Sequence, residues 1–333
     1  MNGVISNMMK TRGKMALPIL SFPSVDFLAT SVNELCHDSE KQAEGMRLVA
    51  GRCDAMASVS YMDLSVEAEC FGSEIMFTEH EVPSVIGKII SCKEDAEALA
   101  VPKVGAARSG IYVEAIKKAK ESITDRPVLA GMIGPLSLAA RLYDVTDIMI
   151  AIFEDPDTVS TVLDKATEFL IEYGRAFREA GADGVVIAEP VAGLFDPFSC
   201  ADFSSNYIKK IVDALQNDSF AVVYHNCGGS VVACLDSIVS TGCAAYHFGN
   251  AVDITEILST VSPDTVVMGN IDPVGVLKSG TPDDVYAKTY ALVEKCASYG
   301  NFIISTGCDV PPATPWENID KFFLAVSDFY EGK

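Results

Sequence analysis

Short apolar runs of strand length alternate along this chain with longer segments in which apolar residues recur every three or four positions. The short runs predict eight buried strands, at residues 17–22, 55–60, 128–132, 184–188, 221–224, 244–248, 266–268 and 302–305. The longer segments predict amphipathic helices, most clearly at residues 156–180, 202–215 and 282–299. Eight such strand–helix units predict an α/β fold in which a parallel sheet closes into a (β/α)8 TIM barrel.

Two segments depart from this alternation. Residues 72–91 are rich in β-forming residues and contain Pro83 and Gly87, which interrupt strands, so this segment predicts an inserted hairpin. Residues 1–15 are expected to be loosely ordered. No compositional break divides the chain, so we expect residues 1–333 to form a single barrel domain.

The acidic composition narrows the possible partners. With 25 Lys and Arg against 46 Asp and Glu, the formal net charge is −21, which argues against nucleic-acid binding because phosphate contact needs clustered cations. It is compatible with a protein partner that has a basic face. Because neither a signal peptide nor a membrane-spanning apolar run is evident, we expect a cytoplasmic protein without membrane contact. The ten cysteines are spread along the chain, and most are expected to be reduced.

Candidate ligands for a metal follow two of the predicted strands. His225 and Cys227 come after the apolar run 221–224, and Cys308 comes after 302–305. In a barrel, these strand ends meet at the C-terminal mouth, where active sites are built. One imidazole and two thiolates are three of the four ligands that zinc prefers, and a fourth position stays open for substrate. By spacing alone, ordinary buried cysteines and a backbone-bonded histidine explain the pattern equally well.

Other polar residues near strand ends are weaker candidates. Cys243 and His247 have a spacing that suits one face of a helix, but on the predicted strand they lie roughly 13 Å apart and form a poor chelate. Glu189 is a catalytic candidate, either as a fourth zinc ligand or as a partner that orients His225. A carboxylate that caps a nearby helix or pairs with Lys or Arg explains it equally well. The remaining candidates are a catalytic Asp63 and three residues for binding substrate or cofactor, Asn270, Asp272 and Asp309.

Longer motifs are similar to those of a known family. Val-Tyr-His-Asn-Cys-Gly-Gly at 223–229, Met-Gly-Asn-Ile-Asp-Pro at 268–273 and Ser-Thr-Gly-Cys-Asp-Val-Pro-Pro at 305–312 occur in the family's order. The segments 61–69 and 183–190 extend the match. Together these motifs resemble the uroporphyrinogen decarboxylase superfamily, and within it the corrinoid:coenzyme M methyltransferases. The resemblance implies the barrel fold and an active site at its C-terminal mouth.

Two branches of that superfamily differ in their site residues. The decarboxylases carry an N-terminal Met-Arg-Gln-Ala-Gly-Arg motif that neutralises the carboxylates of a porphyrinogen, and this chain lacks it. Cys308 stands where the decarboxylases keep a histidine, whereas Asp63 matches an aspartate that both branches share. The methyltransferases use a His-x-Cys pair and a distant Cys as zinc ligands, which correspond here to His225, Cys227 and Cys308.

The resemblance therefore implies a zinc-dependent methyltransferase. Such an enzyme moves a methyl group from methylcob(III)alamin, held by a separate corrinoid protein, to a zinc-activated thiol such as coenzyme M. The alternatives are a metal-free tetrapyrrole decarboxylase, a methyltransferase with homocysteine or tetrahydrofolate as acceptor, and a non-catalytic corrinoid-binding protein that retains the fold.

Overall fold

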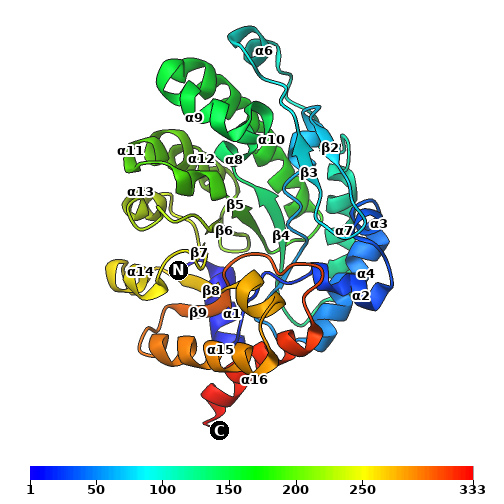
Figure 1. Ribbon diagram of the computed structural model, residues 1–333, viewed down its shortest axis with the longest axis vertical. Helices are drawn as coiled ribbons and strands as arrows, with labels where there is room; N and C mark the ends of the chain where they lie inside the picture. The colour runs from blue at the N-terminus through cyan, green and yellow to red at the C-terminus, as the bar shows by residue number, and fades with distance from the viewer. Residues whose placement is uncertain (333) are drawn as a thin grey trace.

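The main sheet is parallel, with strands in the order β1-β4-β5-β6-β7-β8-β9 (Figure 1). In this computed structural model, which describes residues 1–332, the strands of that sheet are β1 (Ser58–Val59), β4 (Val128–Ile133), β5 (Gly184–Ala188), β6 (Ala221–Asn226), β7 (Ala245–Phe248), β8 (Val267–Ile271) and β9 (Phe302–Thr306). Each overlaps a predicted strand, so seven of the eight predictions are confirmed. The sheet curls into a barrel that the strands do not fully close.

The eighth predicted strand, residues 17–22, is wrong as a strand. Residues 17–21 have no regular secondary structure and lie between the two sheet edges, and Phe22 begins η1. The Leu17 N–H donates to a β9 carbonyl (2.9 Å), and the Ala16 carbonyl accepts from a backbone N–H just ahead of β1 (2.8 Å). Pro18 has no N–H to donate, and the Ile19 N–H donates to a threonine hydroxyl (3.2 Å). A regular ladder therefore cannot form, although the segment occupies the position where an eighth strand belongs.

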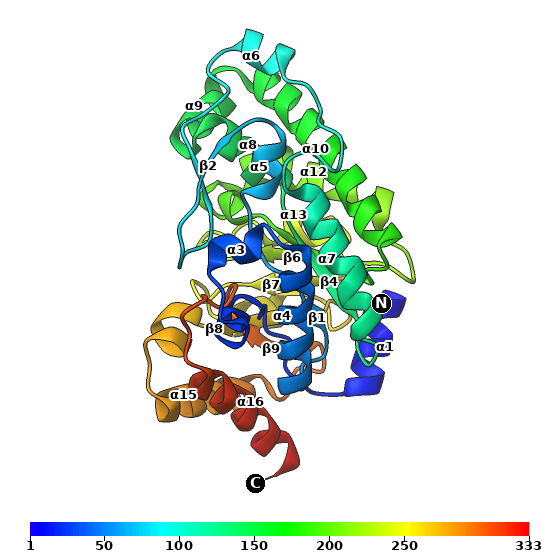
Figure 2. The same ribbon diagram turned by 90° about the vertical axis from the view of Figure 1, so that its right-hand side faces the viewer.

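Helices connect successive strands and cover the outside of the sheet. Their bounds are α1 (Gly3–Arg12), η1 (Phe22–Ser24), α2 (Val25–Leu28), α3 (Val32–Cys36), α4 (Ser39–Arg52), α5 (Val66–Cys70), α6 (Lys93–Ala98), α7 (Ser109–Ser122), α8 (Pro135–Tyr143), α9 (Val145–Glu154), α10 (Pro156–Glu179), η2 (Pro190–Leu194), α11 (Pro197–Cys200), η3 (Ala201–Ser205), α12 (Asn206–Leu215), α13 (Leu235–Ser240), α14 (Ile254–Thr260), η4 (Pro273–Lys278), α15 (Pro282–Cys296) and α16 (Trp316–Glu331). The three predicted helices correspond to α10, α12 and α15. Figure 2 shows α4 and α7 side by side over one edge of the sheet.

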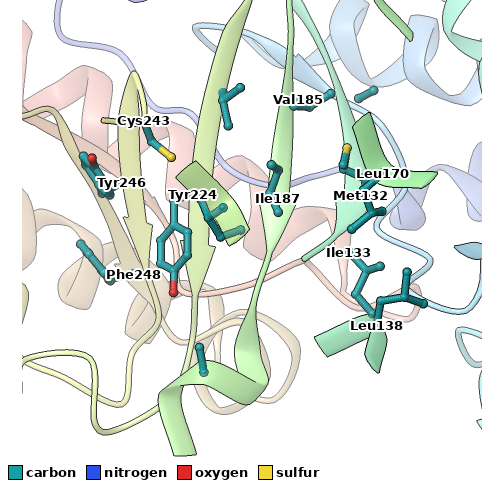
Figure 3. Close-up of a cluster of buried hydrophobic side chains, with 14 of the residues drawn as sticks. Met132, Ile133, Leu138, Leu170, Val185, Ile187, Tyr224, Cys243, Tyr246 and Phe248 are labelled. Carbon is teal, nitrogen blue, oxygen red and sulfur yellow. The ribbon is translucent and has the colours of Figure 1, made fainter. Parts of the chain in front are cut away.

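Side chains of the strands alternate between two hydrophobic clusters, as a period of two requires. Ile187 and Tyr224 belong to the outer cluster between the sheet and the helices (Figure 3). Val186 and Val223 belong to the inner cluster, which fills the inside of the curled sheet. His225 comes two residues after Val223 on the same strand, so its side chain also points inward.

The N-terminal prediction of loose order is wrong, because most of the first fifteen residues form α1. The Asn2 side chain caps this helix by accepting from the Val4 N–H (2.9 Å), and it also donates to the carbonyl of Asn217. Ile5 and Met8 are buried in the inner cluster. Because Asn217 precedes β6, α1 covers the amino-terminal end of the sheet, opposite to the candidate site.

An antiparallel pair, β2 (Glu74–Met76) and β3 (Ser84–Ile86), lies within residues 72–91, where an inserted hairpin is predicted. The chain continues from β3 into α6, which lies at the opposite end of the molecule from α16 in both views (Figures 1 and 2). Within residues 1–332, no helix has both the length and the apolar character needed to cross a membrane.

The docking of α1 can be tested with Ile5→Ala. Ile5 is fully buried, so its truncation leaves a cavity and should lower the free energy of unfolding by about 2–5 kcal/mol. Lys10→Ala on the exposed face of the same helix is the control, with an expected change within about 0.5 kcal/mol. Denaturant titration measures both variants, and equal stability of Ile5→Ala and the parent chain would contradict the docked helix.

Candidate metal centre

The structure brings His225, Cys227 and Cys308 together. One nitrogen of the histidine and the two sulfurs all lie within 4.8 Å of one another, and the His225 Nε2 is 3.5 Å from the Cys308 Sγ. His225 is buried, whereas the two cysteines are half-buried. Donor atoms bound to one tetrahedral zinc ion lie about 3.5–3.8 Å apart, inside the 4.8 Å limit, and one imidazole nitrogen with two sulfurs is a donor set that suits zinc.

Glycines in the neighbouring loops allow this convergence. A Cβ atom on Gly249, just after β7, would lie 2.5 Å from the Cα of Cys227. A Cβ on Gly228 would lie equally close, 2.5 Å, to the Cα of Gly193 in η2. Both contacts are shorter than real Cβ contacts, so only glycine lets the loops after β5, β6 and β7 pack against one another at this end of the sheet.

The two thiols differ in their proton affinity. A hydrogen bond from the Cys308 thiol to the sulfur of Cys227 lowers the pKa of Cys227 well below its ordinary value. The same hydrogen bond, followed by burial, raises the pKa of Cys308. One thiolate is therefore stabilised before a cation binds, as expected of a metal-ligating cysteine pair.

A chain of buried hydrogen bonds leads away from His225. Its Nδ1 is 2.8 Å from the Nδ1 of His247, and the Nε2 of His247 is 2.8 Å from the Ser305 hydroxyl. The Ser305 hydroxyl donates to the carbonyl of Leu17 (2.6 Å). Burial lowers the pKa of His247 well below its ordinary value, so this ring is neutral.

Comparison with known proteins identifies the family. The family model described as uroporphyrinogen decarboxylase (URO-D) matches residues 24–329. A methylcobamide:CoM methyltransferase of Methanosarcina mazei is 33% identical over 274 residues, 80% of this chain and 78% of the relative. A uroporphyrinogen decarboxylase of Hydrogenovibrio crunogenus is 27% identical over 311 residues, 90% of this chain and 86% of the relative. The chain belongs to the methylcobamide:CoM methyltransferase branch of the uroporphyrinogen decarboxylase family.

The same branch is supported by structure. A solved methyltransferase from Methanosarcina mazei superimposes with a TM-score of 0.85 and 25% identity, covering 99% of both chains. The family resemblance noted in the sequence is therefore confirmed, and this chain is a methyltransferase. The identity to the methyltransferase (33%) is higher than that to the decarboxylase (27%), which argues against the decarboxylase alternative.

In this methyltransferase, Glu189 is not among the three donor residues that the structure groups together. Its Oε2 accepts from the Leu136 N–H (3.1 Å) and its Oε1 from the Ser137 N–H (2.6 Å), so it caps the start of α8. The position of His225 Nδ1 beside His247 also excludes Glu189 as the partner that orients His225. The crossover from β4 sets α8 directly above the end of β5, and the positive end of the helix attracts the carboxylate.

Asp63 lies in a buried ion-pair network. It pairs with Arg108 and accepts from the Tyr112 hydroxyl (2.7 Å) and the Ser65 N–H (3.1 Å). Arg108 also pairs with Glu69 at 2.7 Å. Asp63 is not among the grouped metal-ligand atoms, and its two oxygens are already engaged by protein donors.

The three predicted cofactor-binding residues have different surroundings. The Asn270 amide donates to the carbonyls of Gly249 and Val252, both at 2.9 Å, and so holds the loop that packs against Cys227. Asp272 caps η4 by accepting from the first N–H groups of that helix. Asp309 is half-buried, with a buried Oδ1 that has no hydrogen-bond partner within residues 1–332, and desolvation raises its pKa. Asn270 and Asp272 therefore stabilise loops, whereas Asp309 has an unused acceptor.

Sequence reasoning missed one further buried carboxyl group. Glu67 on α5 accepts from the Ile133 N–H (3.0 Å) through Oε1, whereas its Oε2 has no partner within the described chain. Burial raises the pKa of Glu67 to about 7. Its position inside the matched segment 61–69 was the only signal in the sequence.

Glu189→Ala distinguishes a helix cap from a metal ligand. The substitution leaves the Leu136 and Ser137 N–H groups without a buried acceptor and should lower the free energy of unfolding by about 1–3 kcal/mol. The zinc content of the purified variant should equal that of the parent. Elemental analysis and denaturant titration measure both quantities, and loss of zinc without loss of stability would restore Glu189 as a ligand.

Glu67→Gln tests the buried carboxyl group through pH. A carboxyl group whose folded pKa is raised from 4.5 to about 7 binds a proton more tightly in the folded state, so it destabilises the fold as pH rises through this window. The glutamine keeps the acceptor for Ile133 and cannot ionise. Relative to the parent, the variant should gain about 1–3 kcal/mol between pH 5 and pH 8 in denaturant titrations. A stability difference that is the same at both pH values would contradict the raised pKa.

Proposed function

We propose that this methyltransferase binds one zinc ion through His225 Nε2, Cys227 Sγ and Cys308 Sγ. The methyl group would come from methylcob(III)alamin on a separate corrinoid protein and would pass to a thiol such as coenzyme M. The observation that carries the proposal is the convergence of the three donor atoms within 4.8 Å at the carboxyl-terminal end of the sheet. The relatives whose names include methylcobamide and CoM support the same donor and acceptor.

The ligand set suits activation of a thiol. A zinc ion held by His225, Cys227 and Cys308 would supply an open position that lowers the pKa of a bound substrate thiol and keeps its sulfur nucleophilic. The substrate sulfur forms a bond to the methyl carbon, the cobalt–carbon bond breaks with its electron pair left on cobalt, and the thiol proton leaves to solvent. Cys227 and Cys308 are half-buried, so substrate and corrinoid would approach from their exposed side.

The chain's own residues prepare this reaction. The thiolate form of Cys227 is stabilised by a hydrogen bond from the Cys308 thiol, which prepares the pair for a cation. The loop after β7, tied by Asn270, packs against the backbone of Cys227 and fixes its position. We also propose that the segment 16–21 takes the place of the eighth strand and so completes a (β/α)8 barrel, because it forms hydrogen bonds with both edges of the sheet.

The acceptor is the least constrained part of the proposal. Coenzyme M and homocysteine both present a thiol that can occupy the open zinc position. Tetrahydrofolate accepts a methyl group on nitrogen and would not use zinc in this way. A tetrapyrrole decarboxylase would need cations for a substrate with many carboxylates, and the buried cation Arg108 is already paired with Asp63 and Glu69.

Zinc analysis combined with a methyl-transfer assay tests this function. The purified chain should contain about one zinc per molecule and should convert methylcob(III)alamin to cob(I)alamin when coenzyme M is added, as followed by absorbance. Cys308→Ser should lose most of the zinc and at least about 100-fold in rate, because a hydroxyl is a poor zinc ligand. Cys243→Ser, at a buried cysteine outside the metal group, is the matched control and should keep both.

Two results would contradict the proposal. A zinc content far below one per chain, unchanged by Cys308→Ser, would rule out the proposed metal site. Methyl transfer to tetrahydrofolate, with no transfer to either thiol, would rule out the proposed activation of a thiol. Equal rates with homocysteine and coenzyme M would keep the chemistry and broaden the acceptor.

A further inference from the structure

Three buried polar side chains lie in a row on the inner face of the sheet. His225 on β6 is in register with His247 on β7, and Ser305 on β9 completes the row. Neighbouring inward positions on these strands hold Val223, Ala245 and Ile303, which belong to the apolar inner cluster. Each polar group in the row must therefore find its hydrogen-bond partner within the row or at the adjoining backbone.

The direction of these hydrogen bonds is fixed from one end. The Leu17 carbonyl can only accept, so the single proton of the Ser305 hydroxyl points toward it at 2.6 Å. The Ser305 oxygen then accepts from the Nε2 of His247 at 2.8 Å, which places the proton of that ring on Nε2. The His247 ring is buried and its two nitrogens contact His225 and Ser305, so a positive charge on it would have no carboxylate partner; the ring is therefore neutral, and its Nδ1 is an acceptor.

The same logic fixes the tautomer of His225. The two Nδ1 atoms are 2.8 Å apart, so the acceptor on His247 requires that His225 carry its proton on Nδ1. The Nε2 of His225 is then left with a free lone pair, and it faces Cys308 Sγ at 3.5 Å. The opposite arrangement would need one serine proton to serve two acceptors, and one buried hydrogen bond would be lost.

We propose that His247, fixed by Ser305 and the Leu17 carbonyl, is a positioning residue that holds His225 in the tautomer whose Nε2 binds the metal. This inference rests on the proposed metal site, and it adds to that site a partner outside the ligand set. A partner on the far nitrogen fixes the orientation of a ligating imidazole and raises its basicity, and loss of such a partner costs about 10–100-fold in metal affinity.

The test compares two substitutions at His247. His247→Leu removes the acceptor and should weaken zinc binding about 10–100-fold in competition with a chelator. His247→Asn places a carbonyl oxygen near the position of the lost Nδ1, so its zinc affinity should stay within about threefold of that of the parent. Tyr246→Phe is the matched control, because it removes a buried hydroxyl on the same strand that donates to Val239 and does not touch His225.

Nitrogen NMR of the imidazole rings gives a second readout that needs no zinc and no activity. In the metal-free protein, His225 should show a protonated Nδ1 and a bare Nε2, and His247 should show a protonated Nε2. Ser305→Ala removes the acceptor for His247 and should shift the His225 tautomer toward a protonated Nε2. Thermal unfolding of each metal-free variant establishes that it is folded.

The outcomes separate this inference from the proposed function. A folded His247→Leu with the zinc affinity of the parent, or a His225 protonated on Nε2 in the metal-free protein, overturns the inference. If His247→Leu does not fold, the His225 tautomer observed in Ser305→Ala and in the parent protein tests the inference instead. Weakened zinc binding in His247→Leu together with an absence of methyl transfer in the parent would support the inference and remove the proposed function.

Discussion

The register between β6 and β7 is the constraint on which the site depends. It sets His225 directly beside His247 on the inner face of the sheet, and the same parallel arrangement brings the ends of β6 and β9 together. Cys227 and Cys308 follow those ends, so their sulfurs come within reach of the His225 Nε2. A shift of either strand by one residue would turn the histidine to the outer cluster and separate the three donor atoms.

Much of the fold follows from the sequence, because seven apolar runs were long enough to specify buried parallel strands. Residues 17–22 were predicted as a strand from their apolar character, but Pro18 interrupts the donors that a ladder needs and Phe22 begins η1. Helix α1 was missed although the three-residue spacing of Ile5 and Met8 and the capping residue Asn2 were available signals. A helix this short is stabilised mainly by the surface on which it docks, which the sequence does not reveal.

The convergence of His225, Cys227 and Cys308 was predictable because each follows an apolar run that ends a strand. Glu189 satisfies the same rule, yet its carboxylate caps α8, and this contact depends on how the crossover from β4 passes above β5. His247 was considered only with Cys243, its neighbour in sequence. Its actual partner lies on the adjacent strand, and the pairing register between strands is a tertiary property.

The central claim is that one metal ion is bound by two cysteine sulfurs and one histidine nitrogen. X-ray absorption at the zinc edge of the purified protein measures this coordination most directly. The account predicts two sulfur neighbours at about 2.3 Å and one imidazole nitrogen at about 2.0–2.1 Å, with a further light atom at the open position. A shell of oxygen and nitrogen alone, or a single sulfur neighbour, would contradict it.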